Sequence, residues 1–314
     1  MIDKYKKDIA LARSEIRNIY LSDDNELNSI IDDYFKIGGK GVRLILSLIF
    51  SRVGEYEKQY SKLIRNAALV ELIHTTSLIH DDIIDKSLSR RSNPTLNNLY
   101  GNKRALFIGD YLFSTILKEV SSITNRDFHK YLSLTLKELC YGELIQNKDL
   151  YNIDTRVIDY LKKIKRKTAI LIAFACVSAT ILSKANEKEI LASYKFGYYL
   201  GMSYQIMDDY LDFVSDEVTL GKDIGQDLIN GNVTLPIILK IKKSKEKFKE
   251  YRNLSLEEKL TLVNEIRLDD EILIELKNIS HGYLKKALQA IEIFDEDIQE
   301  DLILVVKTLK HRNY

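Results

Sequence analysis

Apolar residues recur every three or four positions through most of the chain, and this helical period restricts the possible folds more than any other feature. No stretch of strand length alternates apolar and polar residues between turn signals, and the only prolines are Pro94 and Pro236. The sequence therefore predicts an all-α protein. The expected helices are Lys4–Tyr20, Glu26–Phe35, Lys40–Val53, Tyr60–Lys86, Arg104–Ser122, Asp127–Asn147, Thr155–Ser183, Lys188–Val214, Leu235–Lys243, Leu256–Leu268, Asp270–Ile293 and one more near the C-terminus.

Long helices joined by short connections are typical of a bundle of antiparallel helices. No linker rich in proline, glycine or serine interrupts the 314 residues, so we expect a single domain over residues 1–314. Two polar segments, Lys86–Gly101 and Ser215–Thr234, break the helical pattern, and each follows a cluster of aspartates. Loops in such positions on a rigid scaffold often carry function.

Charge and composition exclude several classes of protein. The net charge is +1 and basic residues are spread along the chain, which is not the pattern of a nucleic-acid binder. The charged N-terminus lacks the apolar core of a secretory signal, and the longest apolar run, Ala169–Leu182, is too short to cross a membrane. Cys140 and Cys176 fit no disulfide or metal spacing and are expected to be free thiols in helices. We therefore expect a cytoplasmic protein without a transmembrane segment.

Two acidic clusters with the same spacing, DDxxD, end two apolar helices. Residues four apart share a helix face, so each cluster stacks like charges, which is unfavourable unless a cation offsets it. Mg²⁺ prefers such oxygen ligands and is usually held by one or two carboxylates together with substrate phosphates. The alternative, a solvated helix end, is disfavoured because both clusters lie in apolar segments. The predicted metal ligands are Asp81, Asp82, Asp85, Asp208, Asp209 and Asp212.

Basic residues near these clusters are candidates for binding a diphosphate. The turn Gly38–Arg43 opens a helix with Lys40 and Arg43, so that backbone amides and two cations converge. The other candidates are Arg90 and Arg91, Lys167 with Thr168, and Lys222. Each alone is more often a solvated surface residue. Their shared position beside the aspartates favours the binding role.

The run Val70–Tyr111, VELIHTTSLIHDDIIDKSLSRRSNPTLNNLYGNKRALFIGDY, resembles the first aspartate-rich region of trans-isoprenyl diphosphate synthases. Gly201–Pro236, GMSYQIMDDYLDFVSDEVTLGKDIGQDLINGNVTLP, resembles the second, and the GGKxxR element and the KT pair also match. This resemblance implies the isoprenoid synthase fold, with helices around a deep central cavity and both DDxxD motifs at its mouth. It also implies that several Mg²⁺ ions bind with the substrate diphosphate.

The resemblance assigns roles to residues outside the aspartates as well. Arg90, Lys167 and Lys222 match contacts to the allylic diphosphate, whereas Lys40, Arg43, His74 and Arg91 match the pocket for isopentenyl diphosphate. Thr168 and Gln205 match polar groups beside the reacting carbon. No side chain is an obvious general base; the family resemblance implies that the released diphosphate takes the proton, and His80 is interpreted as structural.

Five positions depart from the family pattern, and Tyr204 in place of a frequent phenylalanine is the smallest change. Gly41 stands where many members have a basic residue, Ser92 replaces a usual glycine, and Asp223 replaces a common proline. Asn232 stands where lysine is frequent, which puts one diphosphate contact in doubt.

The expected product is a medium or long all-trans polyprenyl diphosphate for quinone side chains. Thr76 and Ser77, five and four residues before Asp81, are small where short-chain members tend to place an aromatic residue. The chain is most similar to the large catalytic component of bacterial hexaprenyl or heptaprenyl diphosphate synthases, which implies either a homodimer or a heterodimer with a small regulatory subunit. Transient membrane contact for product release is also expected.

Three alternatives stay open at this point. A homodimeric synthase of a shorter product, geranylgeranyl or farnesyl diphosphate, shares most of these motifs. A class I terpene cyclase would normally lack the second DDxxD, and a non-catalytic regulatory subunit would lose metal ligands first, whereas all six aspartates are present.

Overall fold

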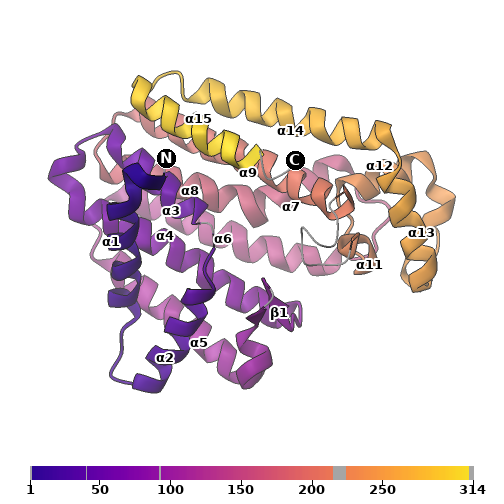
Figure 1. The fold of residues 1–314 in the computed structure, drawn as a ribbon, viewed down its shortest axis with the longest axis horizontal. Helices are drawn as coiled ribbons and strands as arrows, with labels where there is room; N and C mark the ends of the chain where they lie inside the picture. The colour runs from indigo at the N-terminus through magenta and orange to yellow at the C-terminus, as the bar shows by residue number, and fades with distance from the viewer. Residues whose placement is uncertain (1, 40, 92, 215–223, 311–314) are drawn as a thin grey trace. The chain divides into compact units, whose positions relative to one another are not determined.

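The computed structural model describes residues 2–39, 41–91, 93–214 and 224–310, and most of them are helical (Figure 1). The prediction of an all-α protein is confirmed. The α-helices are α1 (Ile2–Tyr20), α2 (Asn25–Ile37), α3 (Val42–Phe50), α4 (Tyr56–Ile84), α5 (Leu96–Ser121), α6 (Arg126–Lys148), α7 (Val157–Ile164), α8 (Ile170–Leu182), α9 (Glu187–Val214), α11 (Gln226–Ile229), α12 (Leu235–Lys243), α13 (Leu256–Arg267), α14 (Asp270–Ala290) and α15 (Glu296–Lys310).

Short 3₁₀ turns extend this pattern at Ser51–Val53, Lys245–Phe248 and Tyr251–Asn253. Among the described residues, no helix combines the length and the apolarity that a membrane crossing needs. Cys176 is buried in α8, as a small apolar side chain would be, whereas Cys140 is exposed on α6; both are free thiols.

The chain forms two compact units, each assembled from separate stretches of sequence. The first contains residues 1–132, 174–193 and 293–304, and the second contains residues 133–173, 194–292 and 305–314.

The first unit is built around α4, which packs against α1, α3 and α5 (Figure 1). Its core is almost entirely apolar, with a polar link where Asn66 donates hydrogen bonds to Ser47 and Ser178. At the N-terminus, Lys4 and Tyr5 both bind the carboxylate of Asp301, so α1 is fastened to α15. The packing against α1, α3 and α5 fixes the position of α4 within the first unit.

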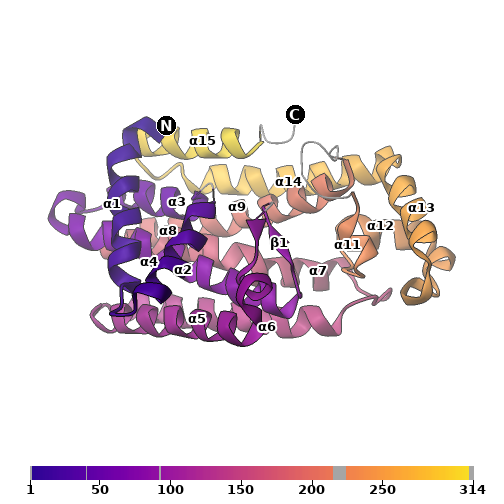
Figure 2. The same cartoon turned by 60° about the horizontal axis from the view of Figure 1, so that its bottom comes forward.

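The segment after α4 differs from the expected loop over Lys86–Gly101. Strands β1 (Ser89–Arg90) and β2 (Asn93–Pro94) pair antiparallel to form a small hairpin, visible in Figure 2. Thr95 caps α5 by accepting a hydrogen bond from the Asn98 amide, so this helix begins well before the predicted Arg104. Gly101, at φ +79°, kinks α5 within the stretch that the sequence pattern treats as a loop.

The second unit packs α12 against α7, α13 and α14. The C-terminal part of α9 runs beside α14, where the hydroxyls of Ser203 and Ser280 lie 2.8 Å apart. Gly201 allows α9 to approach the chain at Ala169, because a Cβ at Gly201 would lie 2.5 Å from the Ala169 Cα. This close approach brings α9 against the residues that follow α7.

The prediction of a single helix over Thr155–Ser183 is wrong in one respect. A five-residue π-helical turn, Lys165–Ala169, separates α7 from α8. Lys167 and Thr168 therefore lie in this turn rather than at the start of a helix. Isolated π turns inside helices occur frequently at functional sites because they redirect side chains.

Candidate active site

The first aspartate cluster lies at the C-terminal end of α4 in the first unit. Asp82 is buried, with 2% of its surface exposed, and its carboxylate accepts hydrogen bonds of 2.8 to 3.1 Å from Arg90 Nε and Nη2. The β1–β2 hairpin turns the chain back so that Arg90 reaches this carboxylate. Asp85 caps α4 and is exposed, and Asp81 is half-buried. Asp82, a predicted metal ligand, is thus paired with Arg90, a predicted diphosphate-binding residue.

A cationic turn lies beside this cluster. Arg91 donates a hydrogen bond to the carbonyl oxygen of Gly38, and a Cβ at Gly39 would lie 2.9 Å from Arg91 Nη1. Gly41 adopts a left-handed conformation with φ +60°, which suits glycine. Arg43 follows in the first turn of α3, while Lys40 lies outside the described residues. The turn therefore brings Gly38, Gly39 and Arg91 together, as a diphosphate pocket requires.

His74 lies on α4 near these cations. Burial, followed by the positive charges of Arg43, Arg91 and Arg90, lowers its pKa well below the ordinary value, so the ring is neutral. Burial raises the pKa of Glu71, one turn earlier. In contrast, His80 Nε2 lies 3.4 Å from Asp110 Oδ1, and the ring packs against Gly109 of α5. Both contacts support a structural role for His80.

The second aspartate cluster lies at the C-terminal end of α9 in the second unit. Asp209 has 4% of its surface exposed and accepts hydrogen bonds from Tyr160 Oη at 2.6 Å and from Gln205 Nε2 at 2.9 Å. Gln205 Oε1 in turn accepts a hydrogen bond of 2.6 Å from Thr168 Oγ1. The π turn and α9 thus join three predicted residues, Thr168, Gln205 and Asp209, in one chain of hydrogen bonds.

Asp227 is a further acidic residue of this cluster that the sequence reasoning missed. Its backbone amide donates a 3.1 Å hydrogen bond to Asp212 Oδ2, and the amide of Gly225 donates a 2.7 Å bond to the Asp212 carbonyl oxygen. Burial, together with the charge of Asp227, raises the pKa of Asp209 to about 8 and that of Asp212 to about 7. An acidic residue in a glycine-containing segment directly after the DDxxD motif was the available signal.

The segment Gly225–Val233 is held through its backbone carbonyls by residues from elsewhere in the second unit. Tyr251 Oη donates to Leu228 at 2.6 Å and Lys259 Nζ donates to Ile229 at 3.2 Å. The amide of Tyr151 donates to Gly231 at 2.8 Å, and Lys163 Nζ donates to Val233 at 3.1 Å. We call this segment the carbonyl-anchored segment. Its anchors fix Asp227 beside Asp212.

Two lysines accompany the second cluster. Burial lowers the pKa of Lys163, while the negative charges of Asp209 and Asp227 act in the opposite direction. Lys167 Nζ lies 3.5 Å from Glu143 Oε1. Lys222, together with Ser92 and Asp223, lies outside the described residues. Asn232 donates a long hydrogen bond of 3.4 Å to Asp227 Oδ1, so at this position an amide supports the acid.

The residues fit a hard divalent cation. Buried carboxyls with raised pKa values lack enough positive charge around them, and a cation supplies it. In the part of the chain that the structure describes, no three His, Cys, Asp or Glu side chains could hold a metal by themselves. Mg²⁺ characteristically takes only one or two carboxylates and completes its shell with phosphate oxygens and water. The two aspartate clusters belong to different units, and that they face each other stays a prediction.

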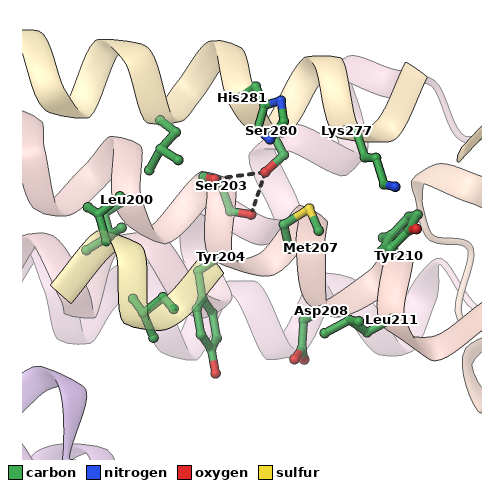
Figure 3. A pocket seen from close by; sticks show the side chains of 13 residues that line it. Leu200, Ser203, Tyr204, Met207, Asp208, Tyr210, Leu211, Lys277, Ser280 and His281 are labelled. Atoms are coloured by element: carbon green, nitrogen blue, oxygen red, sulfur yellow. Dashed lines mark hydrogen bonds between the residues drawn. The ribbon is translucent and has the colours of Figure 1, made fainter. Parts of the chain in front are cut away.

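The residues expected to set product length lie on α4. Thr76 is buried and its hydroxyl has no hydrogen-bond partner in the described part of the chain, whereas Ser77 Oγ donates a 2.8 Å hydrogen bond to the His74 carbonyl oxygen. A small cavity of about 70 Å³ is lined by α9, α14 and the end of α15. Figure 3 shows Ser203 and Met207 directed toward α14, and Tyr204 and Asp208 directed away from it. This cavity lies within the second unit, among α9, α14 and the end of α15.

Acid clusters at the ends of two long helices, each with one buried aspartate and with cations beside it, are the arrangement expected of a helical enzyme that binds diphosphates. The polyprenyl synthetase family matches residues 24–267, and the chain belongs to this family, whose members are prenyltransferases. Its relatives include long-chain trans-polyprenyl diphosphate synthases. Heptaprenyl diphosphate synthase component 2 of Bacillus subtilis (strain 168) is 39% identical over 285 residues, which cover 90% of this chain and 81% of that protein.

Solved structures agree with this membership and confirm the predicted isoprenoid synthase fold. The heptaprenyl diphosphate synthase of Staphylococcus aureus superposes with a TM-score of 0.92 at 32% identity, over 98% of each chain. A decaprenyl diphosphate synthase from Rhodobacter capsulatus gives a TM-score of 0.90 at 25% identity, over 100% of this chain and 98% of that one.

Proposed function

We propose that this protein condenses isopentenyl diphosphate with an allylic diphosphate, such as farnesyl diphosphate, to make a medium or long all-trans polyprenyl diphosphate for quinone side chains. Family membership supports the reaction class. The observation that carries the proposal is the hydrogen-bonded chain from Thr168 through Gln205 to Asp209, beside buried carboxyls with raised pKa values.

Thr168 and Gln205 have a defined part in this reaction. A hydroxyl carries one proton, and Thr168 gives it to Gln205 Oε1, so Thr168 Oγ1 presents only lone pairs to its remaining neighbours. Lone pairs beside the reacting carbon stabilise positive charge that develops on the allylic group. Tyr160 and Gln205 orient Asp209 by donating to both of its oxygens.

The carboxylates would hold Mg²⁺, which when bound neutralises the charge that develops on the leaving diphosphate. The proposed ligands are Asp81, Asp82 and Asp85 on α4, and Asp208, Asp209 and Asp212 on α9. Asp227 orients Asp212 through its backbone amide.

The basic residues divide between the two substrates. Arg90, Lys167 and Lys222 would bind the allylic diphosphate, whereas Lys40, Arg43, His74 and Arg91 would bind isopentenyl diphosphate. Because Arg90 already pairs with Asp82, binding of the allylic diphosphate and Mg²⁺ would replace that ion pair with two new contacts. We also propose that residues 1–314 act as one catalytic domain in the cytoplasm.

The chain is proposed to assemble with a second subunit. The Bacillus subtilis relative is named as one component of a synthase, which supports a heterodimer, and a homodimer is the other form. In the first unit, α5 exposes Leu106, Phe113 and Leu117 at helical spacing along one face, and it exposes Phe107 on the neighbouring face. An apolar stripe of this kind on one helix favours a partner surface.

The test is an assay of the purified chain with farnesyl diphosphate, isopentenyl diphosphate and Mg²⁺, alone and with candidate small subunits. Chain extension is expected, and Asp81→Ala or Asp208→Ala should lower kcat by about a hundredfold or more because each removes a metal ligand. Asp297→Ala, an exposed acid on α15, is the control and should leave kcat unchanged. A cyclic hydrocarbon product, or full turnover in both aspartate variants, would contradict the proposal.

The same assay reports product length. Thr76→Phe places an aromatic ring in the buried position before Asp81, so we expect shorter products than the wild type makes. Chromatographic sizing of the prenyl chains gives the answer, and an unchanged length distribution would refute the role of Thr76.

A further inference from the structure

Tyr34 differs from the other tyrosines of the first unit that are wholly or partly buried. The hydroxyls of Tyr5, Tyr56 and Tyr60 each donate a hydrogen bond to a carboxylate, on Asp301 or Asp8. The Tyr34 hydroxyl is buried and has no hydrogen-bond partner among the described residues. Buried phenol hydroxyls nearly always find a partner, so an unpaired one requires an explanation.

The position of Tyr34 in the fold supplies the first part of that explanation. Tyr34 lies on α2, one turn before Gly38, whose carbonyl oxygen binds Arg91. It is therefore connected directly to the cationic turn that continues to Arg43 in α3.

The charges around Tyr34 supply the second part. Asp82, Arg90, Arg91 and Asp81 all act on its hydroxyl, with Asp82 the strongest of them. Asp82 is already engaged by Arg90, and Arg91 is engaged by Gly38. The unpaired hydroxyl thus lies among residues whose proposed ligands are a diphosphate and its metal.

The chemistry of the phenol decides what it can bind. Burial, followed by the charge of Asp82, raises the pKa of Tyr34 to about 12, so the phenol keeps its proton under all working conditions. A protonated phenol is a hydrogen-bond donor, and near two arginines its natural partner is an anion. This excludes a phenolate that would serve as a metal ligand or a base.

We propose that the Tyr34 hydroxyl donates a hydrogen bond to the diphosphate of isopentenyl diphosphate, beside Arg91. The proposal rests on the proposed function and adds a substrate-binding residue to it. Isopentenyl diphosphate is favoured over the allylic substrate because Tyr34 lies one helical turn before Gly38, whose carbonyl oxygen binds Arg91. The competing explanation is a buried water molecule that satisfies the hydroxyl.

The test is Tyr34→Phe, which removes only the hydroxyl and keeps the ring. We expect KM for isopentenyl diphosphate to rise about tenfold, because one hydrogen bond to a charged group is lost. KM for the allylic substrate and kcat should stay within about twofold of the wild-type values. Tyr60→Phe is the matched control, because it removes a hydroxyl bound to Asp8 and should change neither KM.

Calorimetric titration of isopentenyl diphosphate into the same variants tests the contact without turnover, and a tenfold weaker affinity of Tyr34→Phe is expected. An unchanged KM and affinity would favour the buried water and overturn the proposal. A rise confined to the allylic KM would also overturn it. Absence of turnover in the wild type, by itself, would instead count against the proposed function, since the titration still reports on Tyr34.

Discussion

At the scale of residues, the charge of the second cluster is the feature with the widest consequences. Asp209, Asp212 and Asp227 are held close together in a buried region, with Lys163 as the nearby buried cation. Burial and mutual repulsion disfavour three ionised carboxylates. In the absence of metal, the folded chain therefore keeps protons that the unfolded chain would release.

This gives a pH dependence of stability with a definite sign. An unfolded Asp titrates near pH 4, whereas Asp209 and Asp212 titrate at about 8 and 7 when folded. Between these values the folded state binds more protons, so its stability should fall as pH rises from about 4 to 8. Thermal unfolding in chelator across this range measures the effect, and added Mg²⁺ should raise Tm more at pH 8 than at pH 6.

Asp209→Asn is the control for this pH dependence. The amide keeps the shape of the side chain and removes its titration, so the slope of Tm against pH should become shallower. The same slope in wild type and variant would show that other groups cause it.

The sequence spacing identified the two DDxxD motifs, and the family resemblance identified Thr168 and Gln205, while the roles of these residues stay predictions. The structure joins Thr168 and Gln205 to Asp209 by hydrogen bonds. The contributions of Tyr160 and Asp227 could not be predicted, because they depend on hydrogen bonds between segments distant in sequence. The pairing of Arg90 with Asp82 spans only eight residues, but it depends on the β1–β2 hairpin, which the apolar pattern did not indicate.

At the scale of elements, the approach of α9 to the π turn determines the geometry of the reacting region. Gly201 on α9 lies against Ala169, next to Thr168. The contact leaves no space for a side chain, since a Cβ at Gly201 would lie 2.5 Å from the Ala169 Cα. The distance from Thr168 to Gln205 therefore depends on this glycine.

Gly201→Ala should push α9 away from the π turn. We expect a loss of about 1–3 kcal/mol of stability from overpacking, together with a fall in kcat as Thr168 and Gln205 separate. Gly282→Ala in α14 is the matched control, since nothing lies within 4 Å of its Cβ and alanine is the better helix former. Chemical denaturation and steady-state kinetics on both variants give the answer; equal stability in the two would contradict the packing argument.

Most helices were predictable because their apolar period is long and regular, and α1, α6, α12 and α13 end within a few residues of the expected bounds. The π turn Lys165–Ala169 was not predictable from the sequence, because one additional residue in a helical turn hardly alters the apolar pattern. The early start of α5 was hidden by polar residues around Gly101, a position that interrupts the helical backbone.

At the scale of the whole molecule, the exposed apolar residues of α5, Phe107 among them, predict assembly. Phe107 has 60% of its surface exposed, which is costly for an isolated chain in water. Aromatic residues in such positions often provide most of the binding free energy in protein interfaces. The helical period identified α5 as a helix but could not show which of its faces stays uncovered.

Phe107→Lys should weaken self-association, or association with a small subunit, by about tenfold or more, because it places a charge in an apolar contact. Because the ring is exposed, the folded chain should keep its Tm. Light scattering coupled to size-exclusion chromatography measures the mass, and Leu268→Lys, at a residue 81% exposed directly after α13, is the control. An unchanged mass in Phe107→Lys together with normal activity would place the partner surface elsewhere.

The carbonyl-anchored segment has a consequence for how the protein is made. Tyr251 and Lys259 lie 23 and 30 residues after the residues whose carbonyls they bind, whereas Lys163 lies 70 residues before its own partner. Chains emerge from the ribosome N-terminus first. A nascent chain therefore cannot complete the anchoring of Asp227 beside Asp212 until the polypeptide has been synthesised beyond residue 259, so the proposed metal site forms only after the helices that anchor it.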